Sequence, residues 1–272
     1  MLISRITSLC VLLVVVTSSI AQDSQKALVL PAHAHNDYQH IRPLHDALDC
    51  RFKSIEADVF SVGDSLFVAH DFDKIKPGRT LQKLYLNPLQ ERVAQHNGSV
   101  YGEGTELILL VDIKDDGQRT YKLLHQILES YSEMLTSYRA GKKKQGAIAV
   151  VVSGNRPLSY LQSQEIRYAG YDGRIPDLES GLDASIMPLV SDNWNKYFSW
   201  KGKGEMPDDE KKRLQRFART AHKHGYMLRF WANPDNPGAA RTAVWAALLH
   251  AQLDLIGTDD LKGLQSMFLA DK

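Results

Sequence analysis

Cysteine is scarce in this sequence of 272 residues, which contains only Cys10 and Cys50. Cys10 lies in an N-terminal segment that we expect to be removed, so the mature chain cannot form an intramolecular disulfide. This excludes a small domain held together by disulfides, and a chain of this length buries enough core without them. Because Cys50 follows the helical pattern PLHDALDC, we expect a small packed side chain rather than a nucleophile.

Excess charge is also absent, since the formal net charge is +1. This value provides no general attraction to nucleic acid or to an anionic membrane, so any recognition of an anion must be local. We therefore expect no nucleic-acid partner. The sequence also has no linker rich in proline, glycine or serine and no short repeat, which favours one domain over two.

The N-terminus has the pattern of a signal peptide. Arg5 precedes the apolar run Leu9–Val16, and Thr17–Ala21 supplies the small residues of a cleavage site. The apolar run is far shorter than the ~20 residues of a transmembrane helix, and an uncleaved N-terminal anchor is the alternative. We predict a signal peptide at 1–21, a mature domain at 22–272 and a periplasmic or secreted protein.

Strand and helix patterns alternate along the mature chain. Continuous apolar runs predict buried strands at Glu106–Ile113 and Ala147–Val152, and amphipathic spacing predicts helices at Tyr121–Tyr138 and Asp208–His224. The other expected strands are Ala27–Ala32, Lys53–Phe60, Ser65–Ala69 (antiparallel), Tyr168–Tyr171, Ile186–Val190, Tyr226–Ala232 and Leu253–Gly257, and the other expected helices are Pro43–Leu48, Pro157–Glu165, Ala239–Ala251 and Leu261–Leu269.

About eight strands, most of them followed by a helix, predict a single (β/α)8 TIM barrel. The alternative is a doubly wound sheet, which should have a glycine-rich turn after its first strand. That turn reads HAHND here, and no G-x-G-x-x-G motif occurs in the chain. We also expect a long, functional loop, with or without one helical turn, at Asp71–Gly98 and a solvated basic turn at a helix end at Gly141–Lys144.

Three carboxylates follow the strand patterns closely enough to form a metal site. Glu56 and Asp58 are two positions apart on one strand and so point to the same face, which in a barrel is the interior. Two carboxylates side by side in the interior are costly unless a cation binds between them. Asp112 ends the next buried strand and supplies a third oxygen ligand. An all-oxygen set suits one divalent cation, Mg²⁺ or Ca²⁺, better than zinc.

Two histidines end separate strand-like segments beside these carboxylates. A pair such as His35 and His70 can pass protons at neutral pH, one as base and the other as acid. Asp71 or Asp37 could orient them, and His33, two positions before His35, could contact the site residues without touching the substrate. The other histidines fall in predicted helices or loops, and we assign them no role.

The order of the motifs resembles one known family. H-N-D (His35–Asp37), E-A-D (Glu56–Asp58), A-H-D (Ala69–Asp71) and D-I-K (Asp112–Lys114) resemble the glycerophosphodiester phosphodiesterase family within the phosphatidylinositol-specific phospholipase C-like barrel superfamily, which includes the sphingomyelinase D-type toxins. The segment RFWANP followed by LDLIGTDD is similar to that family's last two strands. The resemblance spans almost the whole mature chain.

This resemblance implies a metal-dependent phosphodiester hydrolase. It implies catalytic roles for His35 and His70, metal ligation by the three carboxylates, and substrate contact by Lys114 and Trp231. Its substrate would be a small phosphodiester or a phospholipid head group, which is compatible with transient contact with a membrane surface. The attacking group, water or a hydroxyl of the substrate, stays open.

The chain departs from the family at two positions. The family usually has arginine and glycine after the first histidine, where this chain has Asn36 and Asp37. Because the arginine binds phosphate, Lys114 and the metal would carry more of that charge here, with Asn36 at the substrate. Asp112 replaces the glutamate of many glycerophosphodiesterases, as in the toxin-like branch.

Two other functions fit parts of the pattern. His33-Ala34-His35 also matches the first metal ligands of amidohydrolase-type barrels, but later strand ends lack the further histidines that such sites need. An exported, non-catalytic protein that binds phosphodiesters is the third interpretation. The sequence gives no indication of the oligomeric state.

Overall fold

The computed structural model describes residues 28–102 and 104–270 of the chain. The signal peptide predicted at 1–21 lies outside the described residues. Within the described ranges, no helix has both the length and the apolar character needed to cross a membrane.

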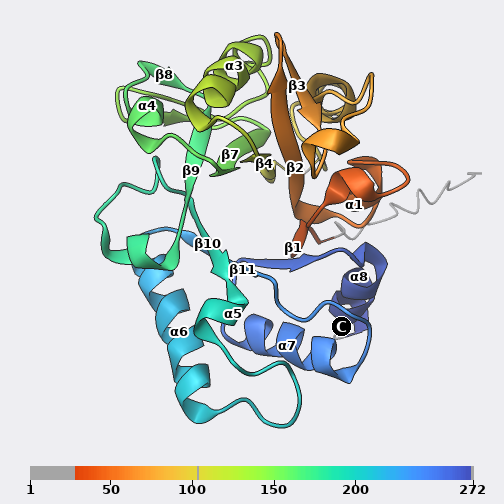
Figure 1. Cartoon of the computed structure of the whole chain (residues 1–272), viewed down its shortest axis with the longest axis vertical. Coiled ribbons are helices and arrows are strands. Elements are labelled where there is room, and N and C mark those ends of the chain that lie inside the picture. The colour runs from red at the N-terminus through yellow and green to blue at the C-terminus, as the bar shows by residue number, and fades with distance from the viewer. Residues whose placement is uncertain (1–27, 103, 271–272) are drawn as a thin grey trace, which may run out of the picture.

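Eight parallel strands form a closed barrel (Figure 1). Their order around the barrel is β1-β12-β11-β10-β9-β7-β4-β2, and β2 pairs back with β1 to close the ring. The strands are β1 (Leu30–Ala34), β2 (Phe52–Val62), β4 (Leu107–Ile113), β7 (Ile148–Gly154), β9 (Ala169–Gly173), β10 (Leu189–Asn193), β11 (Met227–Trp231) and β12 (Leu255–Thr258). The predicted (β/α)8 barrel is confirmed.

Helices follow the strands and cover the outside of the barrel, as Figure 1 shows for α3, α6, α7 and α8. Their apolar faces pack on the strands because a parallel sheet is buried on both sides. The α-helices are α1 (His45–Asp49), α2 (Asn87–Gln95), α3 (Gly117–Glu129), α4 (Leu158–Gln162), α5 (Trp194–Tyr197), α6 (Asp208–Lys223), α7 (Ala239–His250) and α8 (Leu261–Ala270). Short helical turns are η1 (Asp37–Gln39), η2 (Phe72–Lys74), η3 (Gln82–Leu86) and η4 (Ile175–Glu179).

The barrel interior has an apolar layer below a polar one. Side chains from several strands form a separate apolar cluster there, which consists of Ile108, Leu110, Val151, Leu189 and Leu255. Because side chains alternate along a strand, the residue two positions after each member of this cluster also points inward, and it lies nearer the carboxyl end of its strand. Asp112 follows Leu110 in this way, and it is in register with Asp58 of β2. The polar groups therefore converge at the carboxyl-terminal mouth of the barrel.

The segment after the second predicted histidine differs from the expected long loop. Asp71–Gly98 contains η2, η3 and α2, so most of it is helical. Pro88 lies where α2 continues directly from the π-helical η3, so this proline interrupts the regular α-helical hydrogen bonding without ending the helix. β3 (Ser65–Val68) pairs antiparallel with β2, as predicted.

The basic turn at Gly141–Lys144 is also different from the prediction, because no helix ends there. Helix α3 ends at Glu129 rather than Tyr138, and β5 (Ser137–Arg139) and β6 (Lys142–Lys144) form a hairpin. Ala140 and Gly141 both have positive φ, as the two-residue hairpin loop of a right-twisted ribbon requires. Together with β8 (Ile166–Arg167), the hairpin forms a separate three-stranded sheet.

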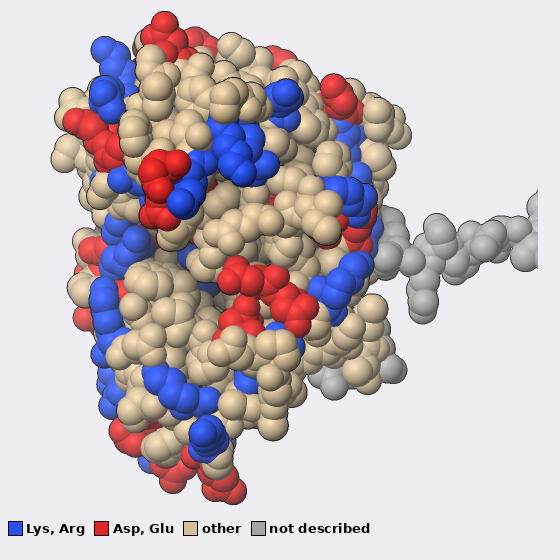
Figure 2. Space-filling view, turned by 45° about the vertical axis from the view of Figure 1, so that its right-hand side comes forward, with Lys and Arg blue, Asp and Glu red and all other residues tan. Residues whose placement is uncertain are grey.

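Two further features are the burial of Cys50 and the distribution of charged side chains on the surface. Cys50 is fully buried in the apolar core, as predicted. Figure 2 shows a compact group of acidic side chains near the middle of the visible face, with basic side chains spread around it.

Candidate active site

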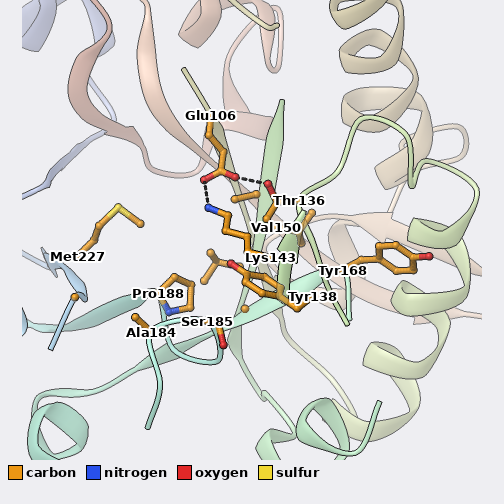
Figure 3. Close-up of a pocket in the computed structure, with 14 residues that line it drawn as sticks. Glu106, Thr136, Tyr138, Lys143, Val150, Tyr168, Ala184, Ser185, Pro188 and Met227 are labelled. Carbon is orange, nitrogen blue, oxygen red and sulfur yellow. Dashed lines mark hydrogen bonds and ion pairs between the residues drawn. The ribbon is translucent and has the colours of Figure 1, made fainter. Parts of the chain in front are cut away.

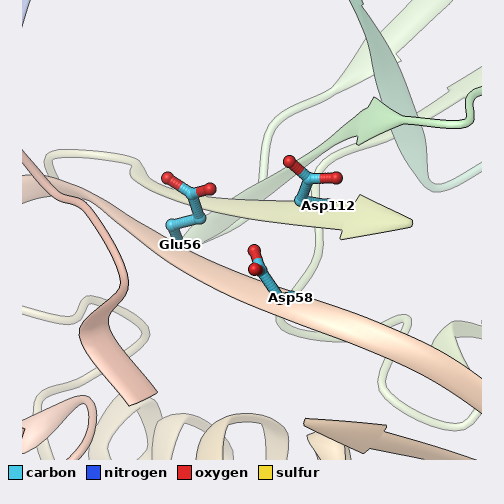
Figure 4. Close-up of side chains that lie close together, drawn as sticks. All are labelled: Glu56, Asp58 and Asp112. Carbon is cyan, nitrogen blue, oxygen red and sulfur yellow. The ribbon is translucent and has the colours of Figure 1, made fainter. Parts of the chain in front are cut away.

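Three carboxylates form the centre of the polar mouth. Glu56 and Asp58 come from β2 and Asp112 from the neighbouring β4, and their side chains converge in Figure 4. One oxygen from each lies within 4.8 Å of the others. Glu56 and Asp58 are buried, whereas the Asp112 side chain is partly exposed. The structure thus brings together the three residues that the sequence analysis assigned to a metal.

The cluster carries excess negative charge, which shows in the pKa values of its carboxyl groups. Burial and the charge of Glu56 raise the pKa of Asp58 to about 6. Burial likewise raises the pKa of Asp112. Asp58 Oδ1 is buried and has no hydrogen-bond partner among the described residues. An unpaired, buried carboxylate oxygen is costly, so the cluster fits a cation.

Behind the cluster, His33 holds Glu56 in place. Its Nε2 lies 2.8 Å from Glu56 Oε2 and its Nδ1 lies 2.8 Å from Ser54 Oγ. Burial, together with the charge of Arg229, lowers the pKa of His33 to about 3, so the ring is neutral. The Nε2–H therefore donates to Glu56, and Nδ1 accepts from the Ser54 hydroxyl. Burial opposes ionisation of Glu56, but the hydrogen bond from His33 and the charge of Arg229 outweigh it and lower its pKa.

Two cationic side chains lie against the carboxylates. Lys114 Nζ is 2.9 Å from Asp58 Oδ2 and 3.3 Å from Asp112 Oδ2. On the other side, Arg229 Nη1 is 3.4 Å from Glu56 Oε2. Three carboxylates against these two cations leave one negative charge, and all the offered ligand atoms are oxygens. That donor set fits one Mg²⁺ or Ca²⁺ ion.

His35, just after β1, is oriented by the end of β12. Its Nδ1 lies 2.8 Å from Asp259 Oδ1, and 39% of its side chain is exposed. Burial opposes the protonated form of His35, but the hydrogen bond to Asp259 and the negative charges of Glu56 and Asp259 together outweigh burial and raise the pKa of His35. With the Nδ1 proton donated to the carboxylate, Nε2 is the nitrogen left to exchange a proton.

His70 is oriented in the same manner by Asp58. Its Nδ1 lies 3.1 Å from Asp58 Oδ2, and 53% of its side chain is exposed. The hydroxyl of Tyr38 lies 2.7 Å from Asp58 Oδ2, 2.7 Å from Asn36 Oδ1 and 3.2 Å from His70 Nδ1. A hydroxyl has one proton to donate, and the carboxylate is the strongest of these acceptors. Tyr38 therefore helps to fix Asp58.

Asn36 connects the two histidine networks. Its Nδ2 lies 3.4 Å from Asp259 Oδ1, and its Oδ1 faces the hydroxyl of Tyr38. Its backbone has a positive φ, a conformation that asparagine tolerates better than most residues. Contact between Asn36 and a substrate stays a prediction.

The two aspartates proposed to orient the histidines do not do so. Asp37 is fully buried and accepts hydrogen bonds from Leu44 N and Tyr85 Oη instead. Asp71 is exposed and makes no side-chain hydrogen bond within the described ranges. Both follow a histidine in sequence, but the chain turns after each strand and directs them away. Asp259 and Asp58 take the role.

Sequence reasoning also missed Tyr38, Asp259 and Arg229. Asp259 follows the last strand, so the strand-end rule that selected Asp112 would have found it. Arg229 is two positions before Trp231 on β11 and therefore shares its inward face. Tyr38 had no comparable signal, because an aromatic residue after a strand is common.

Trp231 lines a pocket of about 200 Å³ beside His35. The pocket lies between the ends of β11 and β12, and its lining also includes Arg229, Asn233, Asp235 and Asp259. The structure thus places the predicted tryptophan next to one of the predicted catalytic histidines.

A second cavity, of about 310 Å³, contains none of these residues (Figure 3). Its charged groups pair with each other, because the Glu106 carboxylate contacts both the Thr136 hydroxyl and Lys143 Nζ. The residues that line it from the barrel include Val150 and Met227, at the amino-terminal halves of β7 and β11. It belongs to the end of the barrel opposite the polar mouth.

Comparison with known proteins gives one match to a protein family and several relatives. Residues 22–172 match the AIM6-like phosphodiesterase domain. The chain is similar to the altered inheritance of mitochondria protein 6 homolog of Arthroderma benhamiae, with 28% identity over 88% of this chain and 84% of the relative. It is similar to the altered inheritance of mitochondria protein 6 of Saccharomyces cerevisiae, with 27% identity over 94% of this chain and 73% of the relative.

Two solved structures are also similar to the chain. The phosphatidylinositol-specific phospholipase C of Listeria monocytogenes has a TM-score of 0.48 and 8% identity, over 84% of this chain and 82% of that one. A glycerophosphoryl diester phosphodiesterase of Parabacteroides distasonis has a TM-score of 0.48 and 10% identity, over 85% of this chain and 80% of that one.

Proposed function

Because the chain belongs to the AIM6-like phosphodiesterase family, we propose that it is a metal-dependent phosphoric diester hydrolase. Its substrates in this proposal are glycerophosphodiesters or phospholipid-type phosphodiesters. The observation that carries it is the pairing of each imidazole with a carboxylate through Nδ1, at the edge of a three-carboxylate cluster.

The two histidines perform the proton transfers. One Nε2 removes the proton from the attacking group, which is water or a hydroxyl of the substrate, and the other donates a proton to the oxygen of the leaving alcohol. Asp259 and Asp58 accept the hydrogen bonds from Nδ1 of His35 and His70 and so leave each Nε2 free to exchange a proton. Since the imidazoles follow different strands, β1 and β3, they can act on different oxygens of one phosphate group.

Glu56, Asp58 and Asp112 would hold the divalent cation. When bound, the ion supplies positive charge that stabilises the negative charge developing on the phosphate oxygens. Lys114 adds a cation at the same edge, where its ammonium can donate to a non-bridging oxygen. Trp231 offers an aromatic face to the apolar part of the alcohol.

A metal site of the amidohydrolase type is disfavoured by His33. Both of its ring nitrogens are hydrogen-bonded to protein side chains, and the ring is fully buried. It therefore offers no lone pair to a metal in the paired ligand arrangement that such enzymes need.

A substrate screen tests the proposed reaction. The full chain is incubated with glycerophosphodiesters, lysophospholipids and inositol phospholipids in Mg²⁺ or Ca²⁺, and the products are analysed for cyclic phosphate. A cyclic product would identify a substrate hydroxyl as the attacking group, and its absence together with turnover would identify water. Binding of the same compounds without turnover would favour the non-catalytic binding protein.

A further inference from the structure

Arg229 is a buried cation whose hydrogen-bonding capacity is largely unused. The residue is only 4% exposed and points into the barrel from β11, in register with Ser191 and Leu255 of its neighbours. Among the described residues its one ion pair, between Nη1 and Glu56 Oε2, is long at 3.4 Å. Its Nε is buried without a hydrogen-bond partner among the described residues. A guanidinium has five N–H donors, so leaving them unpaired in the interior is costly.

A second buried donor lines the same pocket. Asn233 Nδ2 has no hydrogen-bond partner within the described ranges, and Asn233 and Arg229 both line the 200 Å³ pocket beside His35. Three carboxylate oxygens of the pocket already accept hydrogen bonds from protein groups. Asp235 accepts from Thr258 Oγ1 and from Asp259 N, and Asp259 Oδ1 accepts from His35. The pocket therefore contains two side chains with donors unpaired among the described residues, Arg229 and Asn233, which suits a ligand group made of oxygen acceptors.

Arg229 lies between the carboxylate cluster and the pocket beside His35. Its guanidinium is next to Glu56 on one side and shares the pocket with His35 on the other. The two residues that follow His35 supply no cation, since they are Asn36 and Asp37. Lys114 lies at the other side of the cluster, against Asp58 and Asp112.

We propose that Arg229 is a substrate-binding residue whose guanidinium donates to a non-bridging oxygen of the substrate phosphate, with Asn233 as a second donor. This inference rests on the proposed function, because it takes the phosphodiester as the substrate. The phosphate is then held between two cationic side chains, Lys114 and Arg229, on opposite sides of the carboxylate cluster. A guanidinium suits this role because its planar fork matches phosphate oxygens.

The competing explanation is that Arg229 only positions Glu56. The two roles differ in their effect on metal binding. If Arg229 binds phosphate, removing its charge leaves the affinity for the divalent cation unchanged or higher, because a cation beside Glu56 repels the metal. If Arg229 merely orients Glu56, the metal affinity falls.

The test uses the full chain and three variants. Arg229→Gln removes the charge, Arg229→Lys keeps the charge but not the fork, and Arg167→Lys is the matched control. Arg167 is equally buried, at 4% exposure, but it stacks on Tyr138 outside the mouth. Isothermal titration calorimetry measures the Kd of Mg²⁺, of inorganic phosphate at saturating Mg²⁺, and of glycerol as a neutral probe.

We expect Arg229→Gln to weaken phosphate binding by about 10- to 100-fold, as for the loss of a hydrogen bond to a charged group, with a smaller loss in Arg229→Lys. Mg²⁺ and glycerol binding, and phosphate binding by Arg167→Lys, should be no weaker. Unchanged phosphate binding in Arg229→Gln, a parallel loss of Mg²⁺ binding, weaker glycerol binding alone, or no phosphate binding by the wild type would each overturn the assignment.

Turnover of bis(p-nitrophenyl) phosphate is measured separately. Phosphate bound through Arg229 without turnover contradicts only the proposed function, whereas turnover without dependence on Arg229 contradicts only this inference.

Discussion

His35 Nδ1 lies 2.8 Å from Asp259 Oδ1, although 224 positions separate the two residues along the chain. Closure of the barrel makes this contact, because β1 pairs with β12 and their carboxyl ends meet. The first predicted catalytic histidine is thus oriented by the last strand. The candidate site is complete only when the whole barrel has folded.

We predict that Asp259→Asn lowers kcat by up to about 10²-fold, since acid–base catalysis by one group contributes at least that much. The amide cannot stabilise a protonated imidazole as the carboxylate does. Because Asp259 raises the pKa of His35, the limb of the pH–rate profile that reports His35 should move to lower pH. Asp71→Asn is the control and should leave both unchanged; an unshifted profile in Asp259→Asn would show that Asp259 does not tune His35.

His35→Ala and His70→Ala should each reduce kcat by about 10²- to 10⁴-fold. The measurement is steady-state hydrolysis of a phosphodiester at saturating metal. His45→Ala, which changes an exposed histidine on α1, should retain wild-type kcat. Near-wild-type kcat in either of the first two variants would remove that histidine from the mechanism.

The contact between Asp112 and Gly154 predicts a selective loss of metal binding. A Cβ at position 154 would collide with Asp112 Oδ1 and with the backbone oxygen of Ile113. Gly154→Ala should therefore displace the carboxylate and weaken Mg²⁺ binding by about tenfold or more, as changes around metal ligands commonly do.

Gly63→Ala is the matched control for this variant. Both glycines have positive φ, but a Cβ at Gly63 has no heavy atom within 4 Å. The backbone cost, about 1 kcal/mol, should be shared, and only Gly154→Ala should lose metal affinity in calorimetric titration. Equal metal affinity in the two variants would mean that Asp112 is not a ligand.

Asp37 predicts a pH dependence of stability that is unrelated to catalysis. Burial raises the pKa of Asp37 to about 6, against opposing hydrogen bonds from Leu44 and Tyr85. Since the folded state favours the protonated carboxyl, the contribution of Asp37 protonation to the free energy of unfolding is complete below pH ~4. This contribution, roughly 3 kcal/mol, is lost as the pH rises through ~6. Asp37→Asn cannot titrate. Urea unfolding at pH 4 and pH 7 should show the variant gaining stability relative to the wild type at the higher pH, and a constant difference would refute this.

The sequence was sufficient for the parts of the site that follow periodic patterns. The strand patterns located β2 and β4, and the two-residue period placed Glu56 and Asp58 on one face. The register of β4 against β2 then brought Asp112 beside them. β9 ends two residues after the predicted strand Tyr168–Tyr171, and β10 lies three residues beyond the predicted Ile186–Val190, because glycine and proline interrupt these apolar runs.

The remaining parts depend on the direction of turns and on contacts across the barrel. Asp71 directly follows His70 and Asp37 lies two positions after His35, yet the backbone directs both carboxylates away from these histidines. Arg229 reaches Glu56 from a strand on the opposite side of the interior, and no local pattern encodes that distance. The Ala140-Gly141 hairpin depended on positive φ at an alanine, which the sequence alone does not predict.

Hydrolysis of bis(p-nitrophenyl) phosphate by the full chain tests the central claim most directly. The wild type is compared with the variant Glu56→Gln/Asp58→Asn/Asp112→Asn in Mg²⁺ or Ca²⁺, with and without a chelator. The account predicts turnover by the wild type that the chelator abolishes and added metal restores, and none by the variant. The absence of metal-dependent turnover on any phosphodiester, or equal turnover by the variant, would contradict it.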